Sequence, residues 1–290
     1  MEQEQNKRFI ERNVVAILII AVGIAGLILW NPMRERTVSG VETGSQIVTQ
    51  ASGVELPVMW GDLGARLVER GVIDLEKIRS LYGGRWDEEM ESMLLPGSNQ
   101  HIVMTQENAD YLLNLLWAVG LANKNLILAD TQGMMNPEYG GADSFASTGG
   151  WTLSKGDSME HYGAYALVSL TTQQQRLVEK LSRGIYRPCC DNPTSFPDCN
   201  HGMAMLGLLE LLASQGASEE EMWQTALAVN SLWFPDAYAT IALYEQKRGI
   251  EWKDVDPRNV LGYEYSSYSG FSRVAAEVAP QTGSGASCSV

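Results

Sequence analysis

The sequence predicts a mainly α-helical protein with a single N-terminal transmembrane helix followed by an extracytoplasmic helical globular domain. Three observations predict this arrangement. Residues 14–30 form an uncharged apolar run, apolar residues recur at helical spacing after residue 54, and capping residues stand where several of these segments begin. A long irregular glycine-rich segment, residues 129–160, interrupts the helical pattern and is long enough to suggest a functional loop.

The composition indicates a packed globular core. The chain has 290 residues, of which 45% are apolar and 19% charged, as is usual for a soluble domain. Its formal net charge is −14, and lysine and arginine are not clustered anywhere along the chain. Binding to a phosphate backbone requires such a cluster, so we expect no interaction with nucleic acid.

The apolar run Val14–Trp30 has the length and composition of a short bilayer-spanning helix. More positive charge precedes it than follows it, which favours a cytoplasmic N-terminus at the cell membrane. The bulky residues that follow, Trp30 to Met33, do not resemble a signal-peptidase site, so the span is expected to remain as an anchor in the lipid bilayer.

The same observations divide the chain into five parts. We expect a cytoplasmic N-terminus (1–13), a transmembrane anchor (14–30), a linker (31–53), an extracytoplasmic helical domain (54–278) and a disordered tail (279–290).

Within the domain, helical periodicity and capping residues locate the expected helices. Thr105 and Asp198 are expected caps, Thr172 with Gln175 and Ser218 with Glu221 have capping-box spacing, and Pro235 suits a first helical position. We therefore expect helices over 60–72, 74–82, 86–95, 105–122, 172–182, 199–214, 218–232 and 235–247, with regular structure also over 162–170.

The residues best suited to chemistry lie between two of these helices. Cys189, Cys190, Cys199 and His201 have the spacing Cys-Cys-x8-Cys-x-His, and thiolate and imidazole groups bind copper or zinc. Cys199 and His201 stand in the first turn of a helix, where unpaired N–H groups favour a thiolate. The spacing matches neither a zinc finger nor a covalent haem motif.

Three further residues are weaker candidate ligands. Met203 and Met205 lie four residues after Cys199 and His201, so each pair would share a helix face and add a thioether that suits Cu(I). His161 lies before the helix that leads to the cysteines and would add a second imidazole. Methionine on a helix is more often core filling, and a single histidine is more often structural.

Two other functions fit the same cysteines. A disulfide between Cys199 and either Cys189 or Cys190 would staple the loop of an interaction module, leaving one thiol of the three unpaired. Alternatively, these thiols would act in a cysteine-dependent enzyme, with thiol–disulfide exchange as the simplest reaction and His201 nearby. Arg187 would lower the pKa of a neighbouring thiol.

Metal binding, in metal handling or sensing, is the function that the sequence favours, and it leaves open whether the protein is an enzyme. A metal transporter is the partner that metal handling would require, and a redox protein is the partner that thiol exchange would require. The fourth cysteine, Cys288, lies in the expected tail.

Overall fold

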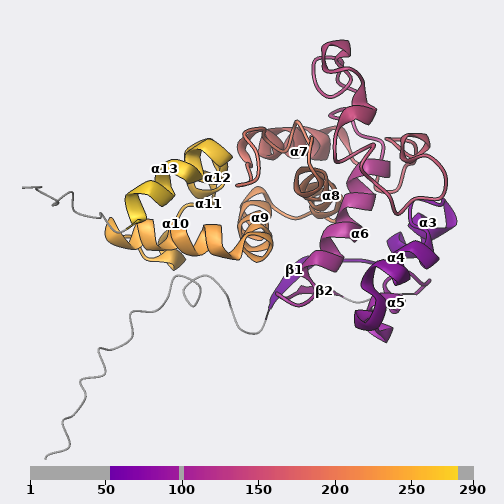
Figure 1. The fold of residues 1–290 in the computed structure, drawn as a ribbon, viewed down its shortest axis with the longest axis horizontal. Helices are drawn as coiled ribbons and strands as arrows, with labels where there is room; N and C mark the ends of the chain where they lie inside the picture. The colour runs from indigo at the N-terminus through magenta and orange to yellow at the C-terminus, as the bar shows by residue number, and fades with distance from the viewer. Residues whose placement is uncertain (1–52, 98–100, 280–290) are drawn as a thin grey trace, which may run out of the picture. The chain divides into compact units, whose positions relative to one another are not determined.

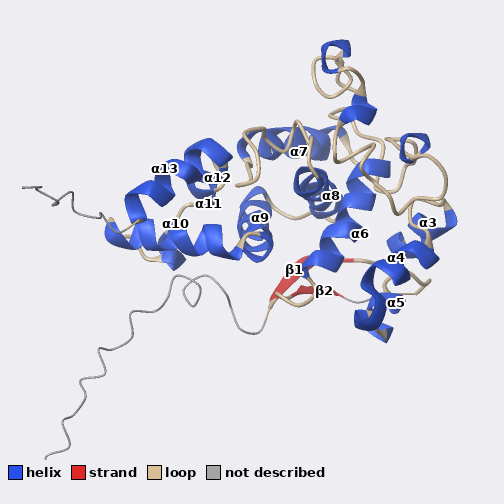
Figure 2. Ribbon diagram, viewed as in Figure 1, coloured by secondary structure: helices blue, strands red, loops and turns tan. Residues whose placement is uncertain are grey.

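A computed structural model describes residues 53–97 and 101–279, and this part of the chain is mainly helical, as predicted (Figure 1, Figure 2). Within these ranges no helix combines the length and apolar character needed to cross a bilayer. The predicted N-terminus 1–13, anchor 14–30, tail residues 280–290 and nearly all of the predicted linker 31–53 lie outside the described residues.

Two helices form the centre of the domain. α6 (Ala109–Ala122) and α8 (Asn200–Ser214) pack against each other more extensively than any other pair of described elements (Figure 1). Their backbones cross at Gly120 and Gly207. A Cβ at Gly120 would lie 2.0 Å from the carbonyl oxygen of Met203, and one at Gly207 would lie 2.3 Å from that of Leu116. Only glycine permits this approach, which sets the position of α8.

The other helices surround this pair. α7 (Thr172–Gly184) and α9 (Glu219–Trp233) pack on α8, and α3 (Leu63–Glu69) packs on α6. α4 (Leu75–Tyr82) and α5 (Glu88–Ser92) lie near α3. α10 (Pro235–Lys247), α11 (Pro257–Val260), α12 (Tyr263–Ser266) and α13 (Tyr268–Val278) form a C-terminal group, in which α13 packs on α10 and α12.

A short two-stranded sheet completes the fold. β1 (Val54–Met59) and β2 (His101–Met104) are antiparallel, with Val54 opposite Met104 and Met59 opposite His101. β1 contacts α8 and α9. These strands were not predicted from the sequence, and neither were α11, α12 and α13. The two strands, α11 and α12 are short, whereas α13 has 11 residues. The strands gain their stability from packing against helices that are distant in sequence.

The predicted starts of α9 and α10 are confirmed, and those of α6 and α7 are wrong. Ser218 and Glu221 form the predicted capping box, and Pro235 is the first residue of α10. The box at the start of α7 is Thr171 with Gln174, one residue before the predicted pair. α6 begins at Ala109, after a turn in which the N–H groups of Glu107 and Asn108 donate to the hydroxyl of Thr105.

The prediction for the segment before His161 is confirmed, and the prediction for the segment after it is wrong. Residues 129–160 are irregular as predicted and contain only short 3₁₀ turns. Residues 162–170 were expected to be regular but form no helix or strand. Arg66 donates hydrogen bonds to the carbonyl oxygens of Ala166 and Leu167, at 2.8 Å each, and Asn123 accepts one from the N–H of Val168. Side chains distant in sequence thus form the hydrogen bonds of these backbone groups.

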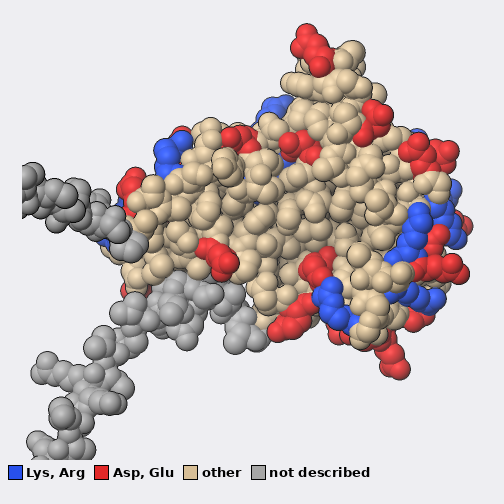
Figure 3. Space-filling model, in the orientation of Figure 1, with Lys and Arg blue, Asp and Glu red and all other residues tan. Residues whose placement is uncertain are grey.

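The charged side chains on the visible face are intermixed (Figure 3). Basic and acidic groups lie close together over α3, α4 and α5, where Arg79 pairs with Glu91 and Arg85 pairs with Asp110. The middle of this face is mostly uncharged.

Candidate metal centre

The candidate site lies in the loop between α7 and α8. The N–H groups of Thr194 and Ser195 donate to the carbonyl oxygens of Ile185 and Ser182, which ties the loop to the end of α7. On the other side, the N–H of Tyr268 donates to the carbonyl of Cys190, and the carboxylate of Asp191 accepts bonds from Ser269. The loop is therefore held between α7 and α13.

This loop brings Cys189, Cys190 and Cys199 together. Their sulfur atoms are separated by 3.5 Å between Cys189 and Cys199, and by 3.9 Å for each of the other two pairs. All three are free thiols, since a disulfide requires a separation of about 2.05 Å. Cys189 is exposed, and the other two are partly buried. The three sulfurs form a group compact enough to hold one metal ion.

The triangle of sulfur atoms has the dimensions of a metal–thiolate site. From these distances, an ion in the sulfur plane would lie about 2.2 Å from each sulfur, close to the zinc–sulfur bond of about 2.3 Å. The arrangement therefore fits a single metal ion.

A buried arginine organises the site. Arg187, only 1% exposed, donates from Nε to the sulfur of Cys199 at 3.0 Å and from Nη2 to the carboxylate of Asp198 at 2.5 Å. It also donates to the carbonyl oxygens of Asn192 and Phe196. Burial lowers the pKa of Arg187, but the negative charges of Cys199, Cys190 and Asp198 outweigh this effect and raise it. The guanidinium therefore stays charged.

Asp198 was predicted to cap α8, and this prediction is wrong. Its carboxylate binds Arg187 on one oxygen and accepts a bond from the side chain of Asn192 on the other, at 2.8 Å. Cys199 is the N-cap instead, with its sulfur 3.4 Å from the donating N–H of Gly202. Because the carboxylate of Asp198 binds Arg187, Cys199 caps α8 in its place.

Cys199 is the most acidic of the three thiols. Hydrogen bonds from Cys189 and Cys190 lower its pKa well below the usual range, His201 and the charge of Arg187 add to this, and burial opposes it. Cys189 donates to both neighbouring sulfurs, which raises its pKa. The bond from Cys189 lowers the pKa of Cys190, but the bond of Cys190 to Cys199 and its burial raise it to about 11. The cluster therefore stabilises one thiolate, on Cys199.

Gly202 makes room for Arg187. A Cβ at this position would lie 2.5 Å from the central carbon of the guanidinium, far inside normal contact. The glycine thus lets Arg187 lie directly against the first turn of α8. From the sequence, Arg187 is predicted only to lie near the thiols. Its contact with Cys199 is not predicted, and neither are the contacts of Gly202, Asn192 and Asp198. Those contacts join residues that only the folded loop brings together.

His201 lies next to Cys199 but outside the three-sulfur group. Its ring packs against Phe234 and Trp233, with centroid distances of 4.4 and 5.7 Å. It also lines a pocket of about 400 Å³ that contains Arg85 and Asp110. The position of this ring is therefore explained by aromatic packing.

The weaker candidate ligands have structural surroundings. Met203 and Met205 are buried in the hydrophobic core, at 0% and 1% exposure. His161 is also buried, and its two ring nitrogens hydrogen-bond to the hydroxyl of Tyr165 and the carbonyl of Lys155, at 2.9 and 3.0 Å. His161 is not part of the cysteine group. Cys288 lies outside the described residues.

Comparisons with protein-family models, with curated proteins and with solved structures find no match to this chain. The function is therefore argued from the geometry of the cysteine cluster.

Proposed function

We propose that this protein binds one thiophilic metal ion through Cys189, Cys190 and Cys199. The observation that carries the proposal is the separation of the three sulfurs by 3.5 to 3.9 Å. Three thiolates that surround a single point favour soft metal ions, above all Cu(I) and zinc. Within the described residues, no histidine or carboxylate atom joins the three sulfurs as a fourth ligand.

Cu(I) is the ion that we favour. It is soft and needs no fourth ligand, whereas a structural zinc site usually has four protein ligands. Three thiolates with Cu(I) leave a net charge of −2, and the buried guanidinium of Arg187 offsets part of it through its contact with Cys199. A zinc ion would take water or another external ligand in the open position.

Metal handling or sensing follows from the exposure of the cluster. Cys189 is exposed, so an ion bound there is open to exchange with another protein, such as a metal transporter. A structural metal site is normally closed on all sides. The difference in burial between Cys189 and the other two cysteines supports a site from which metal can be transferred.

The test is metal analysis of the full chain, purified without oxygen under reducing conditions and titrated with Cu(I) against a chromogenic chelator. We expect one equivalent of Cu(I), with X-ray absorption showing sulfur ligands at about 2.2–2.3 Å. Cys189→Ser, Cys190→Ser and Cys199→Ser should each weaken binding strongly. Cys288→Ser is the matched control and should retain the full equivalent.

Two results would contradict the proposal. One is a wild-type protein that competes for neither Cu(I) nor zinc under these conditions. The other is a set of single cysteine variants that all bind as tightly as the Cys288→Ser control. Circular dichroism of each variant separates loss of the site from loss of the fold.

We also propose that residues 14–30 anchor the protein in the cell membrane, with the metal site outside the cytoplasm. The basis is the uncharged apolar run and the excess of positive charge before it. Labelling of intact cells with a membrane-impermeant maleimide tests this topology, because Cys189 is an exposed thiol. Labelling only after the cells are lysed would place the cluster inside the cell.

A second candidate function is thiol–disulfide exchange, which the environment of Cys199 favours. The Cys199 thiolate would attack the disulfide of a redox partner, and one partner sulfur would leave as a thiolate. The sulfur of Cys189, 3.5 Å away, would then attack the Cys199 sulfur of this mixed disulfide and pass its proton to the departing partner thiolate, leaving a Cys189–Cys199 disulfide. A redox titration decides between the functions: a disulfide potential near that of glutathione supports exchange.

A further inference from the structure

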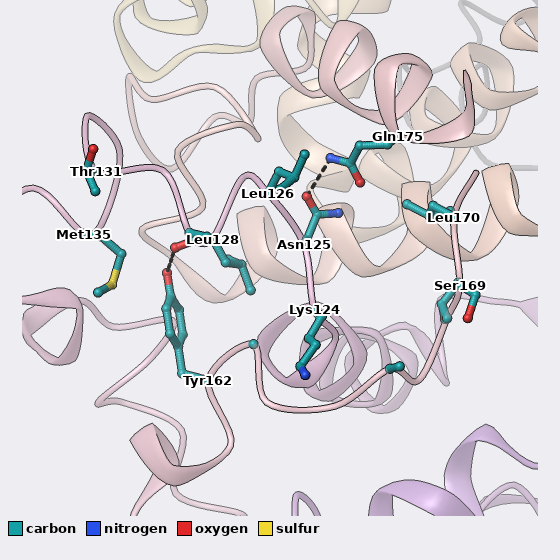
Figure 4. Close-up of a pocket in the computed structure, with 14 residues that line it drawn as sticks. Lys124, Asn125, Leu126, Leu128, Thr131, Met135, Tyr162, Ser169, Leu170 and Gln175 are labelled. Carbon is teal, nitrogen blue, oxygen red and sulfur yellow. Dashed lines mark hydrogen bonds between the residues drawn. The ribbon is translucent and has the colours of Figure 1, made fainter. Parts of the chain in front are cut away.

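A pocket of the described residues lies away from the cysteine cluster. It has a volume of about 730 Å³ and is bounded by residues 124–135, residues 162–170 and the first turn of α7 (Figure 4). This volume is in the range of sites that bind small molecules. Its apolar lining includes Leu126, Leu128, Met135, Val168 and Leu170.

Hydrogen bonds hold the walls of this pocket in place. The hydroxyl of Tyr162 donates to the carbonyl of Leu128 at 2.9 Å, which joins the two long wall segments (Figure 4). Arg66 holds the carbonyls of Ala166 and Leu167. The pocket is therefore formed before any ligand arrives, which reduces the entropy cost of binding.

The apolar surface at the rim is unusually open. Leu126 is 67% exposed and Met135 is 43% exposed, and both line the pocket. Covering a leucine side chain of this kind contributes about 1.5 kcal/mol or more. An apolar group that enters the pocket would gain this free energy.

A polar network stands behind the apolar lining. The Asn125 side chain accepts a hydrogen bond from Gln175 at 2.9 Å (Figure 4). Its amide nitrogen donates to the carboxyl of Glu210 at 2.6 Å. Glu210 lies on α8, is completely buried, and its second oxygen has no partner among the described residues. Burial raises the pKa of Glu210 to about 8, although the hydrogen bond from Asn125 opposes the shift. A perturbed carboxyl beside a cleft often marks a functional site.

One cation lines the pocket without a partner. Within the described residues, the exposed ammonium of Lys124 takes part in no ion pair and no side-chain hydrogen bond, whereas Lys180 and Lys253 pair with glutamates. In Figure 4 the Lys124 side chain points toward the 162–170 segment. The chain has a net charge of −14, so an anion that binds it needs a local positive charge. A local cation above an apolar floor favours an anion with an apolar body.

We propose that this pocket binds a small amphipathic anion, with its acidic group on Lys124 and its apolar body over Leu126, Leu128 and Val168. Asn125, held by Glu210 and Gln175, shapes the base of the site. This binding is independent of the metal site.

The test uses 4-phenylbutanoate as the probe and the full chain labelled with ¹³C at its methionine methyl groups. Met135 lines the pocket, so its resonance, assigned with Met135→Leu, should shift on titration, whereas those of the buried Met203 and Met205 should not. Lys124→Gln should weaken binding of the carboxylate about fivefold and leave binding of 4-phenylbutanol unchanged. Leu126→Ser should weaken binding of both compounds about tenfold.

Lys155→Gln is the matched control, because Lys155 is also exposed and unpaired among the described residues but does not line this pocket. It should bind both compounds as the wild type does. A Met135 resonance that does not respond to 4-phenylbutanoate would overturn the proposal. Equal effects of Lys124→Gln on the binding of 4-phenylbutanoate and of 4-phenylbutanol would also overturn it, since Lys124 would then not distinguish the anion from the neutral compound.

Discussion

Nε of Arg187 donates a 3.0 Å hydrogen bond to the sulfur of Cys199, and the same guanidinium binds Asp198. One buried cation thus joins the thiol cluster to the carboxylate that precedes α8. This contact holds a negative charge on Cys199 and positions the start of the helix.

Replacing Arg187 should therefore affect both reactivity and stability. In Arg187→Gln, Cys199 loses a charged donor, so its pKa should rise toward the usual value and alkylation at neutral pH should slow. The fold should lose about 3 kcal/mol, because Asp198 and the thiolate lose their buried partner. Iodoacetamide kinetics against pH and urea unfolding measure the two effects. An unchanged alkylation profile would mean that Arg187 does not act on Cys199.

Gly202→Ala tests the space that Arg187 occupies. The added Cβ would lie 2.5 Å from the guanidinium carbon, so either the arginine or the start of α8 must move. We expect a loss of about 1–3 kcal/mol and weaker metal binding. Gly84→Ala is the matched control: a Cβ there meets nothing within 4 Å, and its effect should stay within about 0.5 kcal/mol. Equal effects of the two variants would show that the tight contact is unimportant.

His201→Ala should leave metal binding intact. The ring packs on Phe234 and is not part of the three-sulfur group, so the variant should still bind one equivalent of Cu(I) with sulfur-only ligation. Chelator competition together with X-ray absorption makes the measurement. Loss of the ion from a folded His201→Ala protein would show that the imidazole is a ligand, as the sequence alone suggests.

The raised pKa of Glu210 predicts an unusual dependence of stability on pH. Its pKa is raised to about 8 in the folded state, whereas an unfolded glutamate has a pKa of about 4.3. Between these values the folded state keeps a proton that the unfolded state has lost. Stability should therefore fall as pH rises from about 4.3 to 8, by up to about 1.4 kcal/mol per pH unit, and this contribution should level off above pH 8.

Glu210→Gln removes the titrating group and supplies the test for this residue. Urea unfolding at several pH values between 5 and 8 should give a shallower decline for the variant than for the wild type. The comparison uses the slope, because the amide changes the hydrogen bonding to Asn125 and thereby the absolute stability. Parallel slopes would mean that Glu210 has an ordinary pKa.

The helices with local signals could be predicted from the sequence. α9 begins at its capping box of Ser218 and Glu221, and α10 begins at Pro235, because a cap depends on residues within one turn of each other. The same reasoning failed for α7 by one residue. It missed β1, β2 and α13, which are short or depend on packing against distant elements.

The order of residues along the chain is enough to place three cysteines in one short loop before a helix and to make this loop the best candidate for metal chemistry. The residues that join the cysteines become known only from the fold. Arg187, Asp198 and Gly202 meet Cys199 through a folded loop, whereas His201, Met203 and Met205 are drawn into aromatic and core packing. The physical reason is that spacing along a chain limits which side chains can meet, but burial, charge pairing and backbone contact select those that do.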